Sequence, residues 1–100
     1  MFVRIWKFVV RKGFQGDFEG AYGPSGSWVN LFKRGSGYLR TELLRDRSDE
    51  VTYLTIDRWN SKVDFDSFLG QFGKEYEELD ETCKLLLENE VEIGSFDQLS

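Results

Sequence analysis

The chain has 100 residues, of which 40% are hydrophobic and 31% charged. This allows one domain, residues 1–100, with one modest core, and it is too apolar for a disordered chain. Histidine is absent, which excludes Ser-His-Asp and Cys-His nucleophiles, histidine-bearing zinc sites and a histidine-ligated haem iron. The net charge of -5 has the wrong sign for gripping a nucleic-acid backbone, so we expect no nucleic-acid partner.

The N-terminal residues and the cysteine count indicate the cellular compartment in which we expect the chain. Arg4 and Lys7 interrupt the first apolar run, so no uncharged core of a signal peptide remains. No stretch approaches the roughly 18 consecutive apolar residues of a membrane-spanning helix. Cys83 is the only cysteine, so no disulfide can form within the chain, which fits a reducing compartment. We expect a cytoplasmic protein without a membrane partner, with Cys83 as a buried, inert thiol.

The chain begins with a predicted strand and two short helical segments. Residues 2–10 are rich in β-branched and aromatic side chains and end at a basic turn with glycine. The next apolar residues repeat at helical spacing and stop at Gly23-Pro24; they are Phe14, Phe18, Ala21 and Tyr22. A second helical turn, capped by Ser25 or Ser27, then places three apolar residues on one side. These are Trp28, Leu31 and Phe32.

A hairpin follows. Residues 38–46 and 51–59 predict two strands, and the four polar residues between them suit an antiparallel connection. A long helix comes next, because Ser61 and Asp64 resemble a capping box and open an apolar stripe at helical spacing.

Two glycines, Gly70 and Gly73, are expected to kink or split this helix. Residues 91–97 predict a closing strand. Acidic side chains dominate from Glu75 onward, which predicts a solvated acidic face.

The element order β-α-β-β-α-β predicts the ferredoxin-like fold, an α+β arrangement with a four-stranded antiparallel sheet and both helices on one face. The first and third strands carry apolar side chains on both sides, as Phe8 against Ile5 and Tyr53 against Leu54 illustrate. Two helices cover only one face, and the other would exceed the apolar area that monomers tolerate. We expect a second copy to cover it about a two-fold axis, which makes the protein a homodimer.

Motifs along nearly the whole chain stand at the spacing of one known family. They are Tyr22-Gly23-Pro24, Trp28 with Leu31-Phe32, Gly37-Tyr38-Leu39 running into residues 41–46, residues 53–59, Glu75-Tyr76 through Leu79-Asp80 to Cys83, and Ile93-Gly94 before Phe96. This pattern resembles the antibiotic biosynthesis monooxygenase family. The resemblance implies a dimeric α/β barrel in which two ferredoxin-like sheets face one another, with a pocket between each sheet and its helices.

The resemblance also implies an activity. Characterised members oxygenate phenolic or quinol-type compounds with molecular oxygen and without metal or flavin, so no cofactor and no metal site is expected. Such a site must hold an aromatic ring, stabilise the phenolate oxygen and exclude water. The catalytic candidates are Trp59, whose N–H could fix a substrate oxygen, Tyr53 and Arg40. The candidates for binding the small aromatic or hydrophobic ligand are Thr55, Asp57, Tyr76, Phe72 and Trp28.

Each candidate also has a structural interpretation. Trp59 could be a packing residue of the core, and Tyr76 lies on an apolar helical stripe. Arg40 could form only an ion pair, with Glu42 or Asp57. The polar groups of the third strand could simply face water.

Other functions stay open. A dimeric barrel without catalysis could bind a small hydrophobic ligand or act in stress response. A branch of the same family opens haem with an Asn, Trp, His set, and Trp59 matches its tryptophan, but the long helix has no histidine. The RNA-recognition module shares the strand order, yet the sign of the charge and the missing glycine-and-aromatic signature argue against it.

Overall fold

A computed structural model describes all of residues 1–100 and confirms the ferredoxin-like prediction. The elements are β1 (Phe2–Val10), α1 (Gln15–Tyr22), α2 (Ser27–Phe32), β2 (Tyr38–Arg45), β3 (Thr52–Trp59), α3 (Lys62–Cys83), a 3-10 turn (Lys84–Leu86) and β4 (Leu87–Asp97). The last strand starts at Leu87 rather than at residue 91, because Leu87 pairs with Val10 and turns its side chain into the core. Phe14, expected on the first helical stripe, precedes α1 and is exposed.

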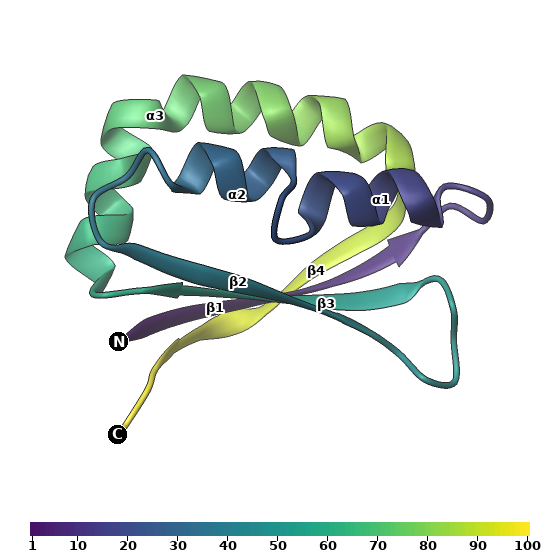
Figure 1. The fold of residues 1–100 in the computed structure, drawn as a ribbon, viewed down its shortest axis with the longest axis horizontal. Helices are drawn as coiled ribbons and strands as arrows, with labels where there is room; N and C mark the ends of the chain where they lie inside the picture. Colours follow the sequence, from purple (N-terminus) through teal and green to yellow (C-terminus); the bar gives the residue numbers. More distant parts are fainter.

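The four strands form one antiparallel sheet in the order β2-β3-β1-β4. The helices lie together over one face of this sheet, and both chain ends leave at the same end of the molecule (Figure 1). None of the helices combines the length and the apolar character that crossing a lipid bilayer requires.

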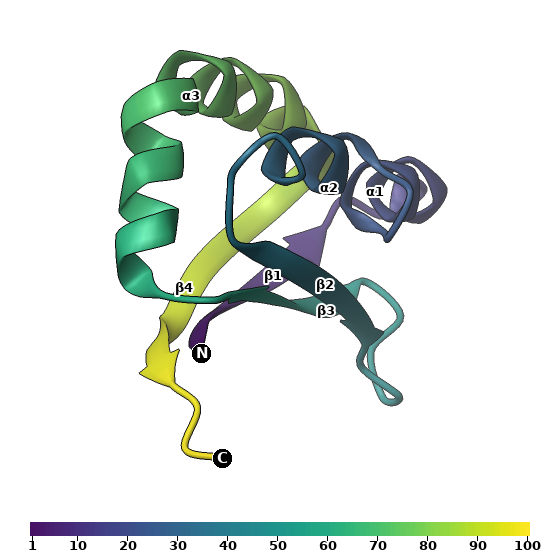
Figure 2. The ribbon, with the colours of Figure 1, turned by 60° about the vertical axis from the view of Figure 1, so that its left-hand side comes forward.

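Helix α3 is bent where the sequence predicts a kink. Ser61 caps its start, since the Ser61 hydroxyl accepts a hydrogen bond of 3.1 Å from the backbone N–H of Asp64. Phe72, which lies between Gly70 and Gly73, has a non-helical backbone with φ -120° and ψ 19°. The first part of α3 therefore rises beside the sheet, and the second part runs across the top of the helical layer (Figure 2).

The core fills the space between helices and sheet with aromatic rings. Phe18, Tyr53, Trp59 and Phe68 are among its most deeply buried side chains. The rings of Phe32, Phe65 and Phe68 surround Trp59 at centroid distances between 5.1 and 5.8 Å. Offset and edge-to-face packing of this kind contributes beyond the buried area alone.

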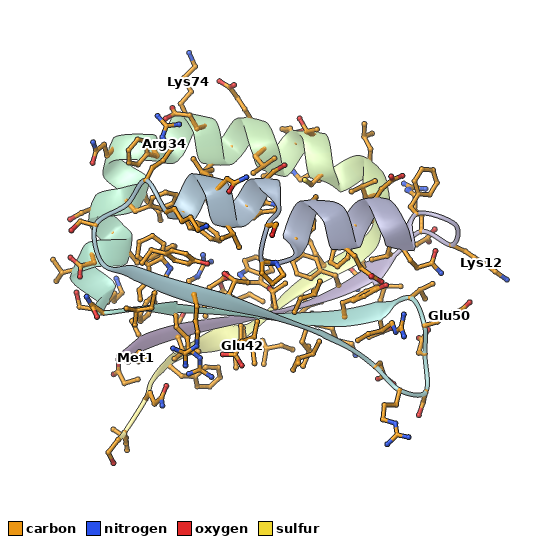
Figure 3. All side chains as sticks on the ribbon, in the orientation of Figure 1. Met1, Lys12, Arg34, Glu42, Glu50 and Lys74 are labelled. Atoms are coloured by element: carbon orange, nitrogen blue, oxygen red, sulfur yellow. The ribbon has the colours of Figure 1, made fainter.

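The sheet face away from the helices is partly apolar and open. The cross-strand pairing places Leu44, Leu54 and Val91 in one row of this face. Leu44, Val91 and Phe96 are each 47% exposed. Glu42 projects on this side, opposite the helices (Figure 3).

Candidate functional site

One cavity opens between the sheet and the helices. The space between its walls is about 440 Å³, a volume that includes open solvent at its mouth. Its wall combines six aromatic side chains with polar ones. The lining residues are Trp6, Phe8, Tyr22, Trp28, Phe32, Thr41, Thr55, Asp57, Tyr76, Asp80 and Glu90. A flat aromatic ligand therefore meets rings on several sides and carboxylates at defined positions.

The strand register builds the floor of the cavity. Thr41 of β2 and Arg4 of β1 are the cross-strand neighbours of Asp57 on β3. In the next row, Thr55 of β3 pairs with Trp6 of β1. Since side chains alternate along a strand, all of these point toward the helices.

Asp57 is the most unusual polar group of this floor, because only 6% of it is exposed. Its Oδ1 accepts a hydrogen bond of 2.7 Å from the Thr41 hydroxyl, which leaves Oδ2 free for a ligand. Burial raises the pKa of this carboxyl to about 6, although the Thr41 hydrogen bond and the Arg4 charge lower it. Asp57 is therefore a buried carboxyl at an aromatic cavity, with a pKa raised toward neutral pH.

Arg4 supplies a positive charge beside Asp57. Its guanidinium lies over the Phe65 ring at 4.5 Å from the centroid and forms a 2.8 Å ion pair with Glu92. The Arg4 side chain is only 11% exposed. Burial raises the pKa of the neighbouring Tyr76 hydroxyl, and the Arg4 charge opposes this shift. Arg4 can therefore stabilise negative charge that develops near Asp57.

The mouth of the cavity is acidic. Asp80 of α3 and Glu90 of β4 both line it. Burial and the Asp80 charge raise the pKa of the Glu90 carboxyl, and the Lys84 charge opposes this shift. Lys84 is shared by Asp80, at 3.6 Å, and Glu81, at 3.0 Å. No three His, Cys, Asp or Glu side chains lie close enough together to hold a metal ion.

The structure brings half of the predicted site residues to this cavity. Thr55, Asp57, Tyr76 and Trp28 all line it. Trp59 and Tyr53 share their strand face but are 0% and 1% exposed and lie in the packed core. Tyr53 donates a 2.6 Å hydrogen bond to Glu19, whereas the Trp59 Nε1–H has no acceptor.

The other two candidates lie outside the cavity wall. Arg40 stands on the opposite face of the sheet, where its Nε lies 3.5 Å from Glu42, as the ion-pair interpretation predicts. Phe72 lies at the kink of α3, where its ring is tilted against the Phe68 ring and the Arg34 guanidinium lies 4.7 Å from its centroid.

Sequence reasoning missed Arg4, Thr41, Asp80 and Glu90. Arg4 carries a recognisable signal, because it interrupts the apolar alternation of β1 between Phe2 and Trp6. Asp80 and Glu90 are part of the acidic C-terminal segment, which looks uniformly solvated in the sequence. Their place at the mouth follows from the kink of α3 and the early start of β4.

Solved structures share this arrangement over nearly the whole chain. A mutant of SnoaB, a cofactor-independent oxygenase from Streptomyces nogalater, superposes with a TM-score of 0.81 at 23% identity and covers 99% of this chain and 93% of its own. A proposed antibiotic biosynthesis monooxygenase from Deinococcus radiodurans gives a TM-score of 0.78 at 11% identity, covering 100% and 94%. Another proposed antibiotic biosynthesis monooxygenase, from Nitrosomonas europaea, gives a TM-score of 0.72 at 16% identity, and the alignment covers 100% of both chains.

The chain has the fold of the antibiotic biosynthesis monooxygenases. The resemblance stated from the sequence motifs is thus confirmed at the level of the fold. No protein-family model matches the sequence, and no curated protein resembles it closely enough to count as a match. Within the antibiotic biosynthesis monooxygenase fold, this chain's cavity between sheet and helices is the place where its own chemistry must be sought.

Proposed function

We propose that this chain is a cofactor-independent monooxygenase that oxidises a small phenol-type or quinol-type compound in the cavity. Asp57 is the observation that carries the proposal. It is a buried carboxyl with one free oxygen and a raised pKa, and it lies at the floor of an aromatic cavity between sheet and helices. General bases in enzymes are tuned in this way, toward the pH at which they work.

The reaction needs a base more than it needs a cofactor. Asp57 takes the proton of the phenol, and a ring carbon ortho or para to the phenolate that still carries hydrogen then becomes electron-rich enough to pass electrons to oxygen. A carbon–oxygen bond forms there, Asp57 returns its proton to the peroxide, and the hydroperoxide loses water as the ring carbon loses its hydrogen and becomes a carbonyl. One oxygen atom enters the substrate and the other leaves as water, so the substrate itself supplies all the electrons.

The surrounding residues support this sequence of steps. The Arg4 charge beside Asp57 lowers the pKa of that carboxyl and so favours the charged carboxylate, which can take a proton. Trp6 and Trp28 line the cavity and supply aromatic contacts for the ring, and the apolar part of the wall keeps water from the hydroperoxide. Thr41 holds one Asp57 oxygen so that the other faces the ligand.

Oxygen consumption tests the proposal. We expect the purified protein to take up oxygen with at least one member of a panel of anthrones and hydroquinones. One oxygen molecule should be consumed per molecule of product, and the product should contain one added oxygen atom, measured with an oxygen electrode and mass spectrometry. Uptake that matches the buffer control for the whole panel would reject the oxygenase and leave a binding role.

We also propose that the working form is a homodimer built on the open sheet face. The family that the chain resembles assembles as dimers, and this face exposes Leu44, Val91 and Phe96 to solvent in the single chain. Glu42 pairs with Arg58 at 2.7 Å on the same face, and Arg40 and Lys7 add positive charge to it. A second copy related by a two-fold axis would meet the same mixed surface.

Sedimentation tests the dimer. At micromolar concentration we expect a mass of twice the 11.7 kDa of one chain. Leu44→Glu should weaken association roughly tenfold or more, since it buries an unpaired charge. Val63→Glu is the matched control, because Val63 is 72% exposed on α3, and it should leave the dimer unchanged. A monomeric wild type would contradict the proposal.

A further inference from the structure

We propose that the substrate of this cavity is an aromatic compound that carries a protonated amine, with its ring between the aromatic walls and its ammonium group between Asp80 and Glu90. This inference deepens the proposed function and rests on it, since both concern the same cavity. It follows from the charges that face the cavity, from where they lie, and from which of them already have partners.

The charged side chains that line the cavity are all acidic. Asp57, Asp80 and Glu90 belong to the wall, and no lysine or arginine does. The nearest cations are already engaged, because Arg4 is paired with Glu92 and Lys84 is shared by two carboxylates. The wall therefore has an excess of negative charge, and Glu90 itself has no ion-pair partner among the salt bridges of the chain.

The remaining wall is suited to a cation as well. Trp6, Trp28 and Tyr76 line the same space. Aromatic rings attract ammonium groups through their negative faces, and carboxylates at the rim strengthen this attraction. A carboxylate-bearing substrate would instead meet like charges at the mouth.

The acidic groups are also spaced for a two-ended ligand. Asp57 lies in one row of the sheet, and Glu90 pairs with Phe8 two rows further along. Asp57 is nearly buried, whereas the Asp80 side chain at the mouth is 34% exposed. A phenol hydroxyl at Asp57 thus leaves the tail of the substrate pointing toward Asp80 and Glu90.

A metal ion is not the cation that this arrangement suits. The three carboxylates do not converge, and no cluster of three ligating side chains exists in the chain. An organic cation, which needs charge and ring contact but no converging ligands, fits the observed spacing.

Binding of three matched phenols tests the inference. Tyramine, para-ethylphenol and para-hydroxyphenylpropionate share the phenol and differ in a positive, neutral or negative tail. Near neutral pH, titration followed by tryptophan fluorescence and calorimetry should show tyramine binding about tenfold tighter than para-ethylphenol, as expected for a charge-assisted contact. The carboxylate should bind most weakly.

Two variants test whether Asp80 and Glu90, at the mouth of the cavity, cause the preference for tyramine. Glu90→Gln and Asp80→Asn should each reduce tyramine affinity roughly fivefold while leaving para-ethylphenol unchanged. Unchanged binding of the neutral phenol shows that each variant keeps its cavity. Glu88→Gln is the matched control, because Glu88 lies on the same strand, is exposed and does not line the cavity.

The outcomes separate this inference from the oxygenase proposal. Equal binding of tyramine and para-ethylphenol, or a preference that survives both mouth variants, would overturn the inference even if oxygen is consumed. Selective tyramine binding without oxygen uptake by any amine-bearing phenol or hydroquinone supports the inference and rejects the oxygenase. Binding of none of the three phenols overturns the inference, whereas the oxygenase proposal still stands or falls with oxygen uptake on its own panel.

Discussion

Asp57→Asn stops oxygen uptake and leaves the fold intact: this is the result we expect from the most consequential single substitution. The amide keeps the shape of the carboxyl and can still accept the hydrogen bond from Thr41, but it cannot take a proton from the phenol. Loss of a general base lowers the turnover rate by roughly a hundredfold to ten-thousandfold. Steady-state oxygen consumption, with circular dichroism to verify the fold, measures both parts of the prediction.

The pH profile shows whether Asp57 acts as the base. With a pKa of about 6, the wild-type rate at low substrate should rise as pH passes through that value and then level off. Thr41→Val removes a hydrogen bond that stabilises the charged carboxylate, so it should shift the rise to higher pH. Asp17→Asn, on the exposed side of α1, serves as the control and should keep the wild-type profile. A profile in which Thr41→Val moves nothing would argue against Asp57.

The same carboxyl should make the protein less stable as pH rises. Its pKa in the folded chain lies above the ordinary value of 3.8, so the folded state binds the proton more tightly than the unfolded state. Stability is therefore lost between about pH 4 and pH 6, on the order of 3 kcal/mol. The Asp57→Asn variant should not show this pH-dependent loss of stability, because its amide does not titrate. The groups that face Asp57, namely Arg4, Thr41 and Tyr76, do not titrate in this range, so urea unfolding of both proteins across it isolates the contribution of Asp57.

Periodicity and turn chemistry predict the fold because they report local structure. The alternation of β1 and β3, the capping serine Ser61 and the glycines around Phe72 each place an element where the structure has it. Local patterns do not predict that β4 begins at Leu87. Leu87 follows a helical turn directly, and only its packing against the core makes it the start of a strand.

The site is harder to predict, because it depends on which side chains the fold leaves unpacked. The sequence does not distinguish Asp57 from Trp59 as a site candidate, because the two residues lie two positions apart on the same face of one strand. In the structure the loop at Gly35 presses on the Trp59 ring so closely that a Cβ at Gly35 would stand 3.1 Å from it. Asp57 has no such neighbour and opens onto the cavity. Contacts between distant segments make this difference, and one sequence does not reveal them.

Trp59 should therefore matter most for stability. Its side chain is fully buried and surrounded by Phe32, Phe65 and Phe68. Trp59→Ala leaves a large cavity and should lower the free energy of unfolding by about 3–5 kcal/mol. Trp59→Phe keeps a ring in place, and it removes an N–H that has no acceptor in the chain. We expect it to cost less than about 2 kcal/mol.

Activity per folded molecule shows whether Trp59 contacts the substrate or only packs in the core. Because Trp59 does not line the cavity, Trp59→Phe should keep oxygen uptake within a few-fold of the wild type, while denaturant unfolding shows the modest loss of stability. A hundredfold fall in the turnover of a well-folded Trp59→Phe would show instead that the indole N–H reaches the substrate. That outcome would require the packing around Trp59 to change when the ligand binds, for example at Phe32, which packs against Trp59 and also lines the cavity. The pair of variants thus separates packing around the site from contact with the substrate.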